Sequence, residues 1–108
     1  MTRTNVDYAK DEINELVDGM ASGNPERPQE IKAGLMKIVS DRTFAAAAEA
    51  ACFWIGHWRM VADMLEVMAQ RSQDARVGDR ERLDSLRGRA KQLQGNASDL
   101  ENALLEVT

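Results

Sequence analysis

FAAAAEAACFWIGHWRMVADMLEVMAQ, residues 44–70, is the longest apolar stretch of this 108-residue chain. If it is read as a helix with Phe44 at position a of a seven-residue repeat, apolar side chains occupy positions a, d and e. Position c is apolar as well, with Ala46, Phe53, Met60 and Val67, so polar residues are confined to a strip at b and f. A helix that is apolar on nearly every side needs neighbours on several sides. The pattern therefore predicts the central helix of a bundle.

The residues before this stretch predict two shorter helices. Thr4 followed by Asp7 resembles a capping box and starts a helix over residues 5–22, which Gly23 would end in a left-handed conformation. Pro28 suits the first turn of a second helix over residues 28–40.

The central helix itself is expected over residues 43–71, with Asp41 or Thr43 as its cap. A polar segment then leads to Asp79, a plausible cap for a fourth helix over residues 79–107. In that helix leucine, alanine and valine recur three and four residues apart, as in a coiled coil, and the pattern continues through Gly95. We therefore expect one continuous fourth helix.

These expectations define an all-α fold: a small helical bundle with two short N-terminal helices and a long antiparallel helical hairpin. The chain fits one domain, residues 1–108. At 1.5 Å per residue the two hairpin helices would each span about 40 Å, the first helix about 25 Å and the second less than about 20 Å. The short helices cannot cover the whole hairpin, and large exposed apolar patches are rare in soluble monomers. The sequence therefore predicts a homodimer or higher oligomer.

The net charge of −4 and the pI near 5.0 argue against a generic nucleic-acid or anionic-membrane binder. Charge is unevenly distributed, however: residues 1–30 hold seven acids and three bases, whereas residues 71–91 hold seven bases and four acids. We interpret the acidic and the basic segment as solvated helix faces. The alternative is a polyanion-binding surface made of Arg76, Arg80, Arg82, Arg87, Arg89 and Lys91.

Cys52 is the only cysteine, so neither an internal disulfide nor a multi-cysteine metal site is possible. Its apolar neighbours Ala51 and Phe53 predict a buried, inert thiol. The N-terminal residues lack the apolar core of a signal peptide, and Glu49 interrupts the longest apolar segment well short of a membrane span. We expect a cytoplasmic protein that does not insert into membranes.

No motif predicts catalysis, a metal site or a cofactor. His57 is the only histidine and lies at the edge of the apolar face, where a structural role at a packing boundary is expected. The seven glycines form neither a phosphate-binding loop nor a dinucleotide fingerprint. The sequence therefore predicts a protein that is not an enzyme.

Trp54-Ile55-Gly56 resembles the tripeptide of the small secreted helical-hairpin proteins named for their WxG motif. In that family the tripeptide lies in the turn between two helices, whereas here it falls inside the predicted central helix. The family's C-terminal tyrosine signal has no counterpart, since Tyr8 is the only tyrosine. The function of that family is therefore not expected here.

Met60, Met64 and Met68 form a row four residues apart, and adaptable methionine surfaces often serve protein recognition. The expected function is that of a non-enzymatic interaction protein, such as an adaptor, assembly factor, chaperone or inhibitor. Its partners would be a second copy of itself and another protein. The alternative is a subunit or regulator of a nucleoprotein complex that uses the basic segment. The predicted interface comprises Trp54, Trp58, Met60, Met64, Met68, Leu86, Leu93 and Leu100.

Overall fold

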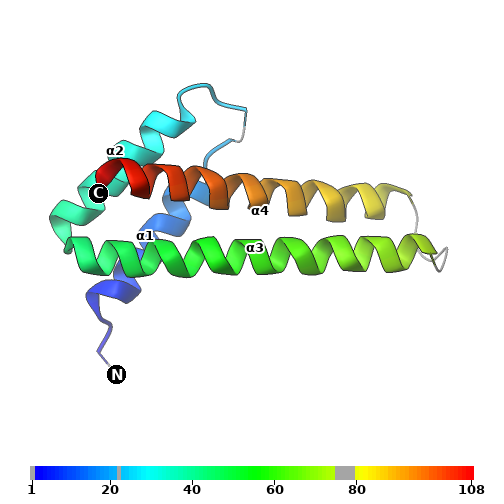
Figure 1. The fold of residues 1–108 in the computed structure, drawn as a ribbon, viewed down its shortest axis with the longest axis horizontal. Coiled ribbons are helices and arrows are strands. Elements are labelled where there is room, and N and C mark those ends of the chain that lie inside the picture. The colour runs from blue at the N-terminus through cyan, green and yellow to red at the C-terminus, as the bar shows by residue number, and fades with distance from the viewer. Residues whose placement is uncertain (1, 22, 75–79) are drawn as a thin grey trace.

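Four helices make up most of the chain in the computed structural model, which describes residues 2–21, 23–74 and 80–108 (Figure 1). In chain order they are α1 (Asn5–Asp18), α2 (Arg27–Asp41), α3 (Phe44–Asp74) and α4 (Arg80–Val107). The described ranges contain no strand. The predicted class, a small all-α helical bundle, is confirmed.

The two long helices, α3 and α4, lie side by side, and α1 and α2 cross them at one end only (Figure 1). Hydrogen bonds between side chains bridge the long helices in three places: Arg87 to Gln73, Gln94 to Glu66, and Arg59 to Glu101. Each step of seven residues forward on α4 is thus matched by a step of seven backward on α3. Beyond α1 and α2, residues 65–74 of α3 and residues 80–88 of α4 form a projecting part that we call the arm (Figure 1).

The buried interior is rich in alanine where α3 and α4 contribute to it. Small side chains let helix backbones approach closely, because the interaxial distance depends on the residues at the contact. Larger apolar side chains enter mainly from α1 and α2, together with Ile55 and Trp58 of α3 and two leucines of α4. The fully buried alanines of the long helices are Ala47, Ala50, Ala51, Ala62, Ala69, Ala90 and Ala97.

Most helix ends agree with the local sequence signals. Thr4 and Asp7 form the predicted capping box, in which each side chain accepts a hydrogen bond from the other residue's backbone N–H. The Thr43 hydroxyl accepts the Ala46 N–H at 3.0 Å, so Thr43 caps α3. The fourth helix is continuous through Gly95, as expected.

The end of α1 differs from the prediction. The helix stops at Asp18 instead of residue 22, and the residue that closes it is Gly19, in a right-handed conformation with φ of −77°. The predicted left-handed cap at Gly23 is therefore wrong. After Gly19 the chain turns, and the Met20 carbonyl oxygen accepts a hydrogen bond from Arg27 at 2.6 Å.

A buried arginine, Arg27, joins the start of α2 to α4. Its side chain is only 3 % exposed. Its Nε donates to Asp99 Oδ2 at 2.8 Å, and its Nη2 donates to Asn96 Oδ1 at 2.5 Å. A buried guanidinium is tolerated only when its donors are paired in this way.

Asn96 extends this network to α1. It is fully buried, and its Nδ2 donates to Asp18 Oδ1 at 2.9 Å. Asp18 also accepts from Arg89 at 3.2 Å. The network thus ties the last residue of α1 and the first residue of α2 to the middle of α4, and no buried side-chain nitrogen or oxygen in the described part of the chain lacks a hydrogen-bond partner.

Candidate interaction surface

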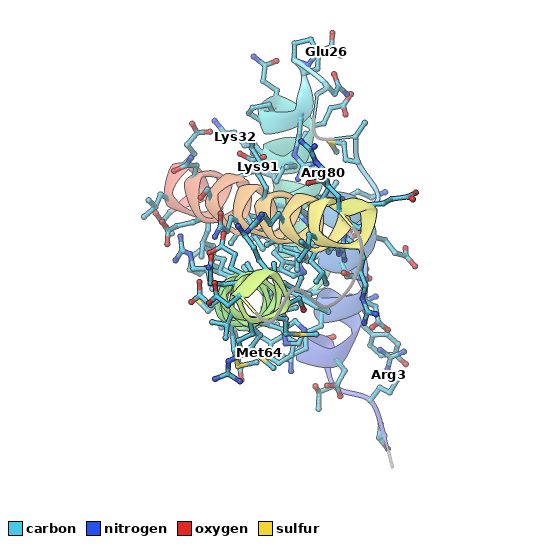
Figure 2. The ribbon with its side chains drawn as sticks, turned by 90° about the vertical axis from the view of Figure 1, so that its right-hand side faces the viewer. Arg3, Glu26, Lys32, Met64, Arg80 and Lys91 are labelled. Carbon is cyan, nitrogen blue, oxygen red and sulfur yellow. The ribbon has the colours of Figure 1, made fainter. Side chains whose placement is uncertain are left out.

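Apart from Phe44 at its first position, α3 has five exposed large apolar side chains, and these point away from the rest of the molecule. Each exposes between 44 % and 57 % of its surface. Figure 2, seen along the arm, shows Met64 on the side of α3 that faces away from α4. Seven-residue spacing relates three of these residues and four-residue spacing relates the methionines, so they form one strip. We call this strip the outer face; it consists of Phe53, Met60, Met64, Val67 and Met68.

Helix α1 marks one border of the outer face. The Trp54 Nε1 donates to the Lys10 backbone oxygen at 2.8 Å, and the Lys10 ammonium lies 4.0 Å from the centre of the Phe53 ring. An ammonium over an aromatic face is attracted by the ring's quadrupole. These contacts fix α1 beside Phe53, and the methionines farther along α3 remain exposed. Position c of the central helix is therefore exposed at Met60 and Val67, whereas Ala46 is buried and Phe53 contacts α1.

An aromatic cluster holds His57 next to this border. Its ring stacks on Phe53 with centroids 5.7 Å apart and meets the edge of Trp54 at 5.4 Å. Trp54 in turn stacks on Trp58 at 5.3 Å. His57 thus lies at a packing boundary, half-buried among aromatic rings. Among the described residues, no group of three or more histidine, cysteine, aspartate or glutamate side chains could hold a metal ion.

The predicted interface residues separate into two groups. Met60, Met64 and Met68 lie on the outer face. The buried group corrects the prediction: Trp58, Leu93 and Leu100 pack in the core of the single chain, because the same heptad seam that could join two chains here joins α3 to the rest of its own bundle. The remaining predicted residues, Trp54 and Leu86, are partly buried.

The basic segment is largely on the surface of α4. Arg80, Arg82 and Lys91 are exposed, and Arg76 lies outside the described residues. Arg87 donates to Gln73 at 2.5 Å, and Arg89 donates to Asp18.

Two acids that could pair with these arginines across the bundle have other partners. Glu12 pairs with Arg42 of α2 at 2.7 Å, and Glu66 accepts a hydrogen bond from Gln94. The acid that Arg89 meets, Asp18, was missed, because it becomes the end of α1 only when that helix stops early.

Cys52 is exposed, so the predicted burial of its thiol is wrong. Its neighbours Ala50 and Ala51 point into the bundle, whereas Cys52 and Phe53 lie on the opposite side of the same helical turn. Apolar neighbours in sequence do not imply burial in a helix, because adjacent residues point about 100° apart.

Comparisons with protein families, curated proteins and solved structures give no match to this chain. Trp54-Ile55-Gly56 lies inside α3 and not in a turn. None of the described helices is long and apolar enough to cross a membrane.

Proposed function

We propose that this chain is a non-enzymatic helical protein of the cytoplasm that acts by binding another protein. Its role would be that of an adaptor, assembly factor, chaperone or inhibitor. In this proposal α3 and α4 form a long antiparallel hairpin with coiled-coil-like packing, and the chain self-associates. The outer face is the observation that carries the proposal.

The outer face supports a binding role because it is both large and continuous. Isolated exposed apolar residues are ordinary on protein surfaces, whereas contiguous patches mark interaction sites. Its methionines, Met60, Met64 and Met68, are unbranched and polarisable, so they can adapt to the shape of a partner. A surface that is solvated when free and binds a partner when one is present needs such adaptable side chains in one continuous strip.

The basic segment gives less support to a nucleic-acid role. Two of its arginines, Arg87 and Arg89, already donate to acceptors of their own chain. Phosphate contacts would have to replace these bonds, and the net charge of −4 opposes the approach of a polyanion.

A charge placed on the outer face tests the proposal. Met64→Glu should change the free energy of unfolding by less than about 0.5 kcal/mol, because the side chain is more than half exposed, yet it should weaken self-association. Sedimentation equilibrium over a wide concentration range measures the association, and thermal unfolding followed by circular dichroism measures the stability.

Met36→Glu is the matched control, because Met36 has a similar exposed fraction, 54 %, but belongs to α2. We expect it to leave self-association unchanged. A wild-type protein that is monomeric at every usable concentration would refute the self-association. A Met64→Glu protein that unfolds would show instead that the methionines are core residues.

A further inference from the structure

We infer that the occupant of the outer face is the outer face of a second copy of this chain, and that the two copies pair antiparallel about a two-fold axis near Met60. The inference rests on the proposed function and adds to it the identity and orientation of the partner. Two observations carry it: the amount of surface that a single chain exposes, and the position of α1 beside the face.

The accessible surface of the single chain is 7013 Å². A compact monomer of 12.0 kDa exposes about 6,000 Å². The excess of about 1,000 Å² is close to the roughly 800 Å² that each partner contributes to a standard interface. The radius of gyration, 15.8 Å, is likewise larger than the value of about 13 Å expected for this chain length. One interface with a second copy would bring the exposed surface per chain down to that of an ordinary globular protein.

The outer face also suits a partner with a straight apolar strip of the same length. α3 has 31 residues and runs along the longest dimension of the molecule, 50 Å. A two-fold contact covers the same strip on both copies at once and closes the assembly without leaving either strip exposed. Charges of α3 have both signs, so they create no uniform field that would repel a second copy; the exposed ones are Glu49, Arg59, Asp63, Glu66, Arg71 and Asp74.

The position of α1 determines the orientation. Its N-terminal half projects past α3 on the side that Met64 faces (Figures 1 and 2). Parallel pairing would bring the two projecting α1 helices to the same end, where they would hold the two α3 helices apart. Antiparallel pairing places each α1 beside the arm of the other copy, where neither α1 nor α2 of that copy lies against α3. Because α1 projects beyond α3 next to Phe53, the second copy is expected to run in the opposite direction.

Spin labels provide the test, and the natural Cys52 is a suitable site because it is the only cysteine and is exposed. Eight residues separate Cys52 from Met60, so an axis at Met60 puts the two Cys52 positions about 25 Å apart, given 1.5 Å per residue and about 10 Å between helices. A label at position 63, introduced as Asp63→Cys in a Cys52→Ser background, should lie about 13 Å from its copy. Pulsed electron paramagnetic resonance resolves the first distance, and line broadening of the continuous-wave spectrum reports the second.

We expect a long distance between the two labels at Cys52 and a short distance between the two labels at position 63. Adding Met64→Glu should abolish both signals. Short distances at both sites would mean parallel pairing, which overturns the orientation but leaves self-association intact. A dimer with both distances beyond about 30 Å, or one that persists in Met64→Glu, would place the contact on another surface and overturn the inference. A monomer in sedimentation would instead refute the self-association on which the inference rests.

Discussion

Replacing Asn96 by alanine should destabilise the protein by about 3–5 kcal/mol, although Asn96 lies in a helix and alanine is the best helix former. Asn96 is fully buried and makes two hydrogen bonds with charged groups, accepting from Arg27 and donating to Asp18. Hydrogen bonds to charged groups contribute about 1.5–3 kcal/mol each, and a buried guanidinium N–H left without an acceptor adds its desolvation cost. Against a typical total stability of about 5–15 kcal/mol, this loss is large.

Urea unfolding followed by circular dichroism measures the difference, at one fixed protein concentration because self-association would also change the apparent stability. For a chain of 108 residues a loss of 3 kcal/mol corresponds to a decrease of about 13 °C in Tm. The matched control is Gln94→Ala, which removes an amide of the same helix that bonds Glu66 on the surface, and it should change stability by less than about 0.5 kcal/mol. If Asn96→Ala costs less than about 1 kcal/mol, the network does not hold α1 and α2 against α4, and the reasoning is wrong.

Two further outcomes are expected. Hydrogen bonds from Thr4, first from its backbone N–H and then from its side chain, hold the pKa of the exposed Asp7 carboxyl below its ordinary value of 3.8. Because that pKa is lower in the folded state, the stabilisation is present above pH 3.8 and is lost as the pH falls below it. The protection of the first-turn amides of α1, taken as the intrinsic exchange rate divided by the observed rate at each pH, should therefore decrease in acid, and Asp7→Asn should remove this pH dependence. Binding to DNA or RNA should be weak and abolished by physiological salt, since a protein with many phosphate contacts would show measurable affinity there and a steep salt dependence. Tight binding in a fluorescence-anisotropy titration at that salt concentration would favour the nucleoprotein alternative.

The helix caps were predictable from the sequence, because the two residues that form each cap lie within one helical turn of each other. Thr4 and Asp7 form the capping box from residues three apart, and Thr43 caps the next helix but one in the same way. The apolar periodicity of the long helices likewise indicated their lengths and their continuity through Gly95.

Features that depend on distant residues were not predictable. The partners of Asn96, Arg27 and Asp18, lie 69 and 78 positions away in the sequence, and no spacing rule connects them. Cys52 was expected to be buried because its sequence neighbours are apolar, but the side of α3 that faces the bundle depends on how the other helices pack against it. The methionine row was recognisable as a candidate surface, because its geometric premise, short helices beside long ones, depends only on helix length.

The matched hydrogen bonds between α3 and α4 limit how the arm can vary in length. Gln73, Glu66 and Arg59 meet Arg87, Gln94 and Glu101 at intervals of seven on both helices. Deleting one heptad from each helix would shorten the arm by about 10 Å and bring the remaining pairs back into the same contacts. Removing one to three residues from a helix, or a heptad from one helix alone, would bring the apolar side chains of the two helices out of register. Length variants of this protein that still fold should therefore differ by whole heptads removed or added in pairs.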